Sequence, residues 1–67
     1  MPVVEITLVS GRSPEELRAM ISAVTRAVSE TVAAPVAAIR VIIREVPTSH
    51  FAAGDVTIAE RQAVPVT

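Results

Sequence analysis

Few side chains in this 67-residue sequence can do acid–base or nucleophilic chemistry. The sequence contains no cysteine, tyrosine or lysine, and its one histidine is His50. What remains is arginine, carboxylate and the amino terminus. An arginine guanidinium cannot act as a base at neutral pH, although its planar fork binds carboxylates and stabilises developing negative charge. A base for proton transfer must therefore come from another group.

The candidate for that base is the nitrogen atom of Pro2. If Met1 is removed, the ring nitrogen of Pro2 becomes a free secondary amine that can accept and release a proton. An α-amino group has a reference pKa of about 7.7, and burial or nearby cations lower that pKa toward the operating pH of a proton-transfer enzyme. The alternative is structural, because proline has no amide proton and is often the first residue of a strand.

The composition argues against several classes of protein. A net charge of −1 and a single aromatic residue, Phe51, leave neither a basic face nor a stacking platform for nucleic acid. No apolar run approaches the ~20 residues of a membrane span, and no signal-like segment begins the chain. One histidine without cysteine cannot build an ordinary zinc site. We expect a cytoplasmic protein that binds no metal, nucleic acid or membrane.

The chain is also too apolar for a small monomer. Hydrophobic residues make up 51% of the sequence, and the mean hydropathy is +0.54. A single domain of this length buries only about 60% of the surface that its unfolded chain exposes. The sequence therefore predicts self-association.

Periodicity predicts a strand, a helix and a second strand. Residues alternate from Val3 to Val9, as in a strand with one dry face. Ser13, Pro14 and Glu16 form a capping-box sequence that starts a helix at Pro14, and Pro35 ends it near Ala33. The second strand is expected from Ile39 to Val46. The predicted apolar stripe of the helix is Leu17, Ile21, Val24, Val28 and Val32.

These elements predict an α+β fold, with a single β-α-β unit of parallel strands and a short C-terminal β-hairpin that includes residues 56–58. Residues 1–61 are expected to form the domain, and residues 62–67 a tail without regular structure. Such a small sheet leaves one face and its edges uncovered, so that face should meet another subunit. The side chains expected on it are Glu5, Thr7, Arg40, Ile42 and Arg44.

Several separate motifs occur within roughly the first 60 residues: Met1-Pro2, Gly11-Arg12-Ser13 after the first strand, Ala34-Pro35 followed by the segment from Ile39 to Glu45, and His50-Phe51. Together they resemble the 4-oxalocrotonate tautomerase family. The resemblance implies an isomerase without cofactor, in which the amino-terminal proline is the general base for 2-hydroxymuconate-type dienol diacids. It also implies a site shared between subunits of a homohexamer built as a trimer of dimers.

The resemblance assigns roles residue by residue. Pro2 would be the base, Arg12 would bind the distal carboxylate, and Arg40 would bind the near carboxylate and polarise the 2-oxo group. Phe51 would supply an apolar wall, and the backbone around Val9 would help to place the carbonyl oxygen. The substrate would be a small dicarboxylate or 2-oxo acid from aromatic hydrocarbon catabolism.

Each residue also has a structural alternative. Arg12 follows a glycine and could be a solvated charge at a turn. Arg40 could form an ion pair with a carboxylate such as Glu5 across a subunit interface, and Phe51 could fill a core or an interface. His50 is expected to be an exposed loop residue.

Two other functions remain open on the same scaffold. One is a haloacrylate dehalogenase or hydratase, and the other is a non-catalytic partner subunit of a hetero-oligomer. The sequence departs from the family pattern at Ala52-Ala53-Gly54-Asp55, where many relatives have a Gly-Gly hairpin. Asp55 places a negative charge near a site expected to hold a dianion, which leaves the substrate open.

Overall fold

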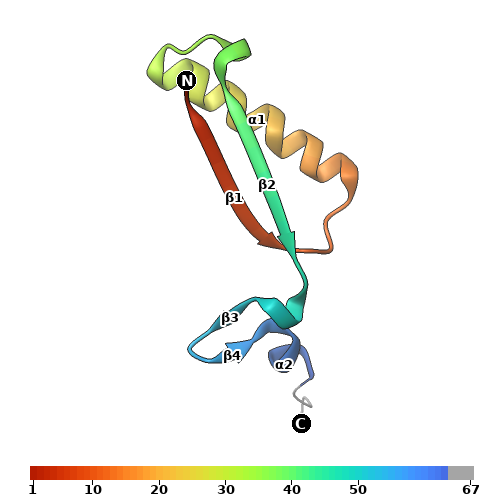
Figure 1. The fold of residues 1–67 in the computed structure, drawn as a ribbon. Helices are drawn as coiled ribbons and strands as arrows, with labels where there is room; N and C mark the ends of the chain where they lie inside the picture. The colour runs from red at the N-terminus through yellow and green to blue at the C-terminus, as the bar shows by residue number, and fades with distance from the viewer. Residues whose placement is uncertain (64–67) are drawn as a thin grey trace.

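The computed structural model describes residues 1–63, which form a β-α-β unit followed by a small C-terminal module (Figure 1). In chain order the elements are β1 (Val3–Val9), α1 (Pro14–Val32), η1 (Val36–Ala38), β2 (Arg40–Val46), η2 (Thr48–His50), β3 (Ala52–Ala53), β4 (Val56–Thr57) and α2 (Ile58–Ala63); η1 and η2 are single 3₁₀ turns.

The two long strands are parallel, as predicted. β1 and β2 pair in an unbroken register from Val3 opposite Arg40 to Val9 opposite Val46. α1 connects them and covers one face of this two-stranded sheet (Figure 1). The α+β fold expected from the sequence is confirmed, and β2 begins at Arg40, one residue later than predicted.

Local sequence explains both ends of α1. The Ser13 hydroxyl accepts a hydrogen bond from the Glu16 amide (3.1 Å), and the Glu16 carboxylate accepts one from the Ser13 amide (2.9 Å). This capping box confirms the predicted start at Pro14. At the other end Ala33 adopts a left-handed conformation (φ 56°), and Pro35 prevents the helix from continuing.

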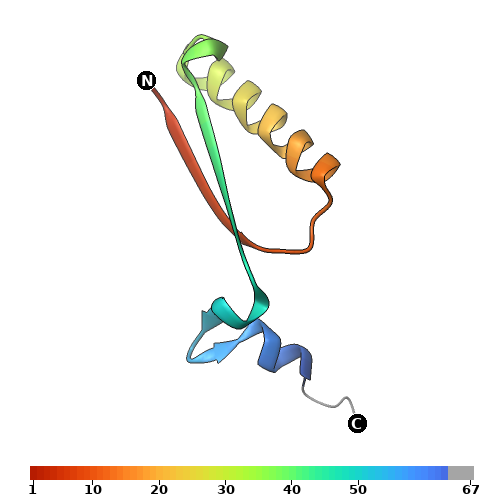
Figure 2. The same ribbon diagram turned by 45° about the vertical axis from the view of Figure 1, so that its right-hand side comes forward.

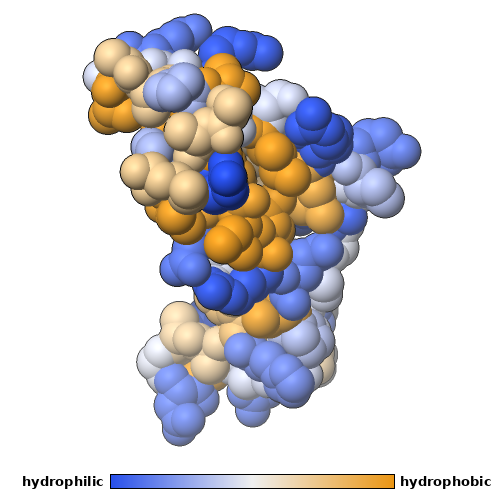
Figure 3. Space-filling view, turned by 45° about the horizontal axis from the view of Figure 1, so that its top comes forward, coloured by the Kyte–Doolittle hydropathy of each residue, from blue (hydrophilic) through white to orange (hydrophobic). Residues whose placement is uncertain are grey.

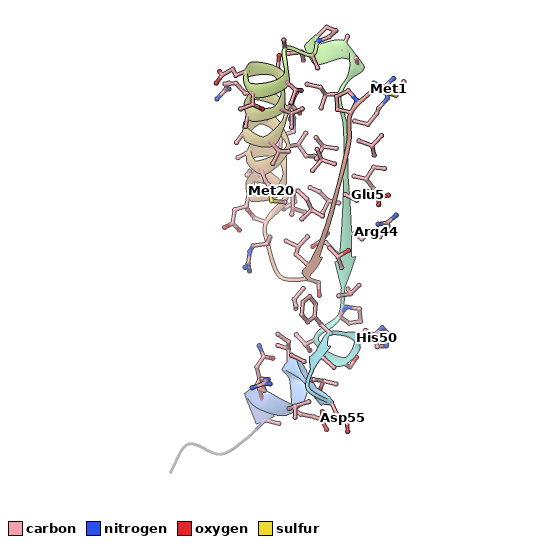
Figure 4. All side chains as sticks on the ribbon, turned by 90° about the vertical axis from the view of Figure 1, so that its left-hand side faces the viewer. Met1, Glu5, Met20, Arg44, His50 and Asp55 are labelled. Carbon is pink, nitrogen blue, oxygen red and sulfur yellow. The ribbon has the colours of Figure 1, made fainter. Side chains whose placement is uncertain are left out.

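Alternation along the strands divides the sheet into two faces. Val4, Ile6, Val41 and Ile43 are half-buried beneath α1, as their spacing predicts. In Figure 4, Met20 points from α1 toward the sheet, whereas Glu5 and Arg44 point away from the helix. One residue of the predicted helix stripe does not belong to it: Val32, in the last turn of α1, is 62% exposed.

The C-terminal module contains the predicted hairpin. Gly54 and Asp55 connect β3 to β4 with positive φ angles of 60° and 65°, as a tight two-residue turn requires. The expected extended piece at residues 56–58 is shorter than predicted, because Ile58 begins α2. Figure 2 shows this module beyond the end of β2, away from α1.

α2 was not predicted, although the sequence contains its start signal. The Thr57 hydroxyl accepts a hydrogen bond from the Glu60 amide (3.0 Å), and the Thr57 amide donates one to the Glu60 carboxylate (2.8 Å). This is a second capping box. The expected boundary at residue 61 therefore falls within a helix that extends to Ala63, while the rest of the predicted tail lies outside the described residues.

The described chain is elongated and exposes most of its apolar side chains. It measures 50 × 25 × 17 Å, and its radius of gyration is 15.8 Å, against about 11 Å for a compact domain of this length. Ile39 is the one buried apolar residue in the part of the chain that is described. Figure 3 shows apolar surface open to solvent beside charged groups. Exposed apolar surface of this kind is typical of protein–protein interfaces.

Within residues 1–63, no helix has both the length and the apolar character needed to cross a membrane.

Candidate active site

Pro2 and Arg40 lie together at one end of the sheet. Val3 is opposite Arg40 in the parallel register, so Pro2 precedes the first residue pair. The Arg40 amide donates a hydrogen bond of 3.0 Å to the Pro2 carbonyl oxygen. This bond fixes the start of β2 next to the N-terminus, so the candidate base and one candidate arginine share this end of the sheet.

The Arg40 side chain is exposed on the sheet face opposite α1. Its Nη1 atom donates a hydrogen bond of 2.8 Å to the Ala37 carbonyl oxygen, in the η1 turn just before β2. The one salt bridge in residues 1–63 joins Arg44 to Glu5, so Arg40 has no carboxylate partner within the described chain. A neutral carbonyl orients Arg40 but leaves its positive charge uncompensated.

Arg12 and Val9 lie at the opposite end of the sheet. Val9 is the last residue of β1, and Gly11 turns the chain toward α1 with a φ of 129°. The seven residues of β1 span about 23 Å at ~3.3 Å per residue. Arg12 is therefore too far from Pro2 of the same chain for both to contact one small substrate.

Arg12 is exposed beside the start of α1. The pKa of the nearby Glu16 carboxylate is lowered, first by the hydrogen bond from the Ser13 amide, then by the Ser13 side chain, and more weakly by the charge of Arg12. Arg12 thus combines a solvent-accessible guanidinium with a position at the rim of the sheet.

Phe51 belongs to the same end as Arg12. Phe51 follows η2 beyond the end of β2, and the residue is 36% exposed. Its carbonyl oxygen accepts a hydrogen bond of 2.9 Å from the Ile58 amide, which joins the loop to α2. The C-terminal module thus presents the one aromatic ring of the chain on its surface.

The candidate residues therefore form two separate groups. Pro2 and Arg40 make up the first, which we call the amine end; Val9, Arg12 and Phe51 make up the second, which we call the arginine-loop end. One chain cannot bring the two ends together, because the length of β1 separates them.

The other polar features contribute little to this arrangement. His50 is exposed in η2, as predicted, and Asp55 lies at the tip of the hairpin (Figure 4). Residues 1–63 contain no cluster of acidic or histidine side chains that could hold a metal ion. A groove of about 530 Å³ runs along α1 beside η1 and includes Arg18 and Arg26, but none of the candidate residues lines it.

Comparison with known proteins assigns the family. The family model of the tautomerase enzymes matches residues 2–61. The 2-hydroxymuconate tautomerase of Stutzerimonas stutzeri is 41% identical over 54 residues, which cover 81% of this chain and 86% of the relative.

Solved structures agree in fold. TomN, a 4-oxalocrotonate tautomerase homologue in the tomaymycin biosynthetic pathway, is 43% identical, with a TM-score of 0.93 over 97% of this chain and 100% of TomN. A heterohexamer 4-oxalocrotonate tautomerase from Chloroflexus aurantiacus is 35% identical, with a TM-score of 0.86 over 90% of this chain and 97% of its own.

The chain belongs to the tautomerase enzyme family and is a cofactor-independent isomerase. The family predicted from the spaced motifs is thus confirmed.

The sequence analysis did not predict the ion pair between Glu5 and Arg44 on the sheet face opposite α1. Glu5 is opposite Ile42 in the register, and Arg44 is two residues after Ile42 in β2. The alternation of the two strands contained the signal, because it places all three charged side chains of that face on one surface.

Proposed function

We propose that this tautomerase isomerises 2-hydroxymuconate-type dienol acids to their conjugated 2-oxo isomers, with the Pro2 amine as general base after removal of Met1. The observation that carries the proposal is the strand pairing that puts Arg40 next to Pro2. A proton acceptor and a carboxylate-binding cation are the two groups that such a proton transfer needs at one place.

The reaction moves one proton and leaves the composition of the substrate unchanged. The Pro2 nitrogen accepts the proton of the 2-hydroxyl group, and the resulting negative charge is shared between the 2-oxygen and C5. The protonated amine then delivers the proton to C5, which leaves a 2-oxo group and regenerates the free amine. Arg40 binds the neighbouring carboxylate and stabilises the charge on the 2-oxygen while it develops.

The arginine-loop end of a second chain completes the site. Its Arg12 binds the distal carboxylate, and its Phe51 forms an apolar wall that excludes water from the amine. The backbone near Val9 helps to position the 2-oxygen. The separation of the two ends by the length of β1 supports this division between chains, and we propose a homohexamer as the assembly. The Chloroflexus relative, a heterohexamer, makes a mixed assembly with a related chain the alternative.

The direct test is an ultraviolet assay with 2-hydroxymuconate on protein of verified N-terminal sequence. We expect rapid conversion that needs no added metal or cofactor. Because the chain has no lysine, an amine-selective acylating reagent modifies only Pro2 in the processed protein, and this single modification should abolish turnover. Full activity after complete acylation contradicts the role of Pro2.

A second candidate is a biosynthetic tautomerase that acts on a different enol acid. TomN favours it, because TomN matches 97% of this chain at 43% identity and belongs to the tomaymycin biosynthetic pathway. Slow turnover of 2-hydroxymuconate, combined with an amine whose acylation still abolishes that turnover, would support this candidate. Halide release from a haloacrylate would instead indicate the dehalogenase alternative.

A further inference from the structure

We propose that Arg44 is a positioning residue that binds Glu5 and thereby keeps the guanidinium of Arg40 free for a substrate carboxylate. The inference rests on the proposed role of Arg40. It concerns the open face of the sheet, where one carboxylate lies between two arginines.

The strand register creates a choice of partner for Glu5. Glu5 is opposite Ile42, and Arg40 and Arg44 are the residues two positions before and after Ile42. Because side chains of a strand alternate between faces, both arginines project to the same side as Glu5. Glu45 belongs to the other face, so Glu5 is the one carboxylate that the two strands present on the open face.

In the structure Glu5 selects Arg44. The Arg44 Nη2 atom lies 3.0 Å from the Glu5 Oε1 atom, and both side chains point away from α1 (Figure 4). Arg40 instead donates to the Ala37 carbonyl oxygen at 2.8 Å, at the end of the strand. The two hydrogen bonds draw the guanidinium groups in different directions, and the charge of Arg40 stays unpaired.

This arrangement matters because a second carboxylate would compete with the substrate. If Arg44 were absent, Glu5 would have Arg40 as the remaining cation on its face. Glu5 would then bind Arg40 and repel an incoming dicarboxylate. In solvent both effects are small, and the Glu5 and Arg44 side chains are 53% and 55% exposed in the single chain. A neighbouring subunit on this face would lower the local dielectric constant and strengthen both effects.

The test compares Arg44→Gln with the double variant Arg44→Gln/Glu5→Gln. We expect Arg44→Gln to raise KM for the dicarboxylate substrate about tenfold with a smaller change in kcat, because binding is lost through competition. The dissociation constant of adipate, a six-carbon dicarboxylate that cannot react, should rise in parallel. Removing Glu5 in the same chain should restore both values. The matched control is Arg26→Gln, which removes an exposed arginine of α1 and should change neither value.

Glu5→Gln alone distinguishes positioning from mere structural support. It should lower KM by roughly twofold, since the open face then has two arginines without an opposing carboxylate. Light scattering on each variant detects defects in assembly. If Arg44→Gln does not assemble, the KM of Glu5→Gln tests the proposal. A KM that rises in Glu5→Gln as it does in Arg44→Gln contradicts the proposal, as does a double variant that is not rescued. Arg40→Gln with normal KM and kcat would overturn the proposed function itself.

Discussion

The Arg40 amide donates a hydrogen bond of 3.0 Å to the carbonyl oxygen of Pro2, so the first residue of β2 is fixed to the residue before β1. The parallel pairing of β1 and β2 continues from this contact in an unbroken register. A shift of the register by one residue would turn every side chain of β2 to the other face of the sheet, so the fold fixes this contact. The sheet thus sets the position of Arg40 relative to the N-terminus.

That relationship predicts different effects for the two candidate arginines. Arg40→Ala should lower kcat by about 100-fold or more, because it removes stabilisation of charge that develops only in the transition state. Arg12→Ala should mainly raise KM by about tenfold, because the distal carboxylate is charged throughout the reaction. Steady-state kinetics with 2-hydroxymuconate measures both parameters. Small and equal effects in the two variants would indicate structural charges instead.

Separation of the amine end from the arginine-loop end predicts complementation between inactive chains. At substrate concentrations well below KM, Pro2→Ala homo-oligomers should be inactive, and Arg12→Ala homo-oligomers should have about a tenth of the wild-type activity. Unfolding and refolding of an equal mixture should restore roughly a quarter of the wild-type activity, the value for random assembly of sites that need one intact residue from each chain. Light scattering should show the same assembly size for the mixture and the wild type. Absence of any recovery in a correctly assembled mixture would contradict a shared site.

The capping box of α1 predicts a defined acid sensitivity. The hydrogen bond from the Ser13 amide lowers the pKa of Glu16 in the folded chain. The stabilisation it gives is therefore complete above the pKa of an unfolded glutamate, about 4.3, and is lost as the pH falls through the lowered folded value. Glu16→Gln should show a smaller fall of Tm between about pH 6 and pH 3 than the wild type.

Glu15→Gln is the control for that measurement, since it removes the adjacent carboxylate, which takes no part in the capping box. Its Tm should fall with pH as steeply as that of the wild type. Ser13→Ala should lower Tm by about 5 °C at neutral pH, because it removes the side-chain oxygen that caps the helix. Identical pH profiles of Tm for Glu16→Gln and the wild type would show that the Glu16 carboxylate does not stabilise the helix.

Local rules predicted the elements that have strong local signals. The alternation in Val3–Val9 and the capping sequence at Ser13 placed β1 and the start of α1 correctly. α2 was not predicted, because its capping pair, Thr57 and Glu60, starts a helix of only six residues with little apolar periodicity. Val32 was placed in the buried stripe by its spacing, but it is the last residue of α1 and is 62% exposed.

The candidate site was harder to predict from sequence than the fold. The separate motifs named Pro2, Arg12, Arg40 and Phe51, and the predicted parallel strands put Pro2 and Arg40 at strand starts, but these patterns do not say which residues of the two strands are paired. The parallel register supplies that information, since it places Arg40 beside Pro2 and leaves Arg12 beyond the other end of β1. The choice of Glu5 between two arginines depends on side-chain geometry, which alternation alone cannot decide.

The proposed chemistry also requires that Met1 be absent from active protein. With Met1 in place the Pro2 nitrogen is part of an amide and cannot accept a proton. Intact-mass measurement of active preparations should therefore show the loss of one methionine. In partly processed samples, specific activity should increase in proportion to the processed fraction, and full activity in protein that retains Met1 would exclude the amine mechanism.

The pH dependence of kcat/KM tests the role of Pro2 most directly. It should be measured for the processed protein, for the same protein acylated at its single amine, and for His50→Ala. We predict a rising limb with increasing pH, as the amine loses its proton, that persists in His50→Ala and disappears, together with most of the rate, after acylation. Acylated protein that keeps its activity, with a limb that is lost in His50→Ala, would contradict the account and identify His50 as the base.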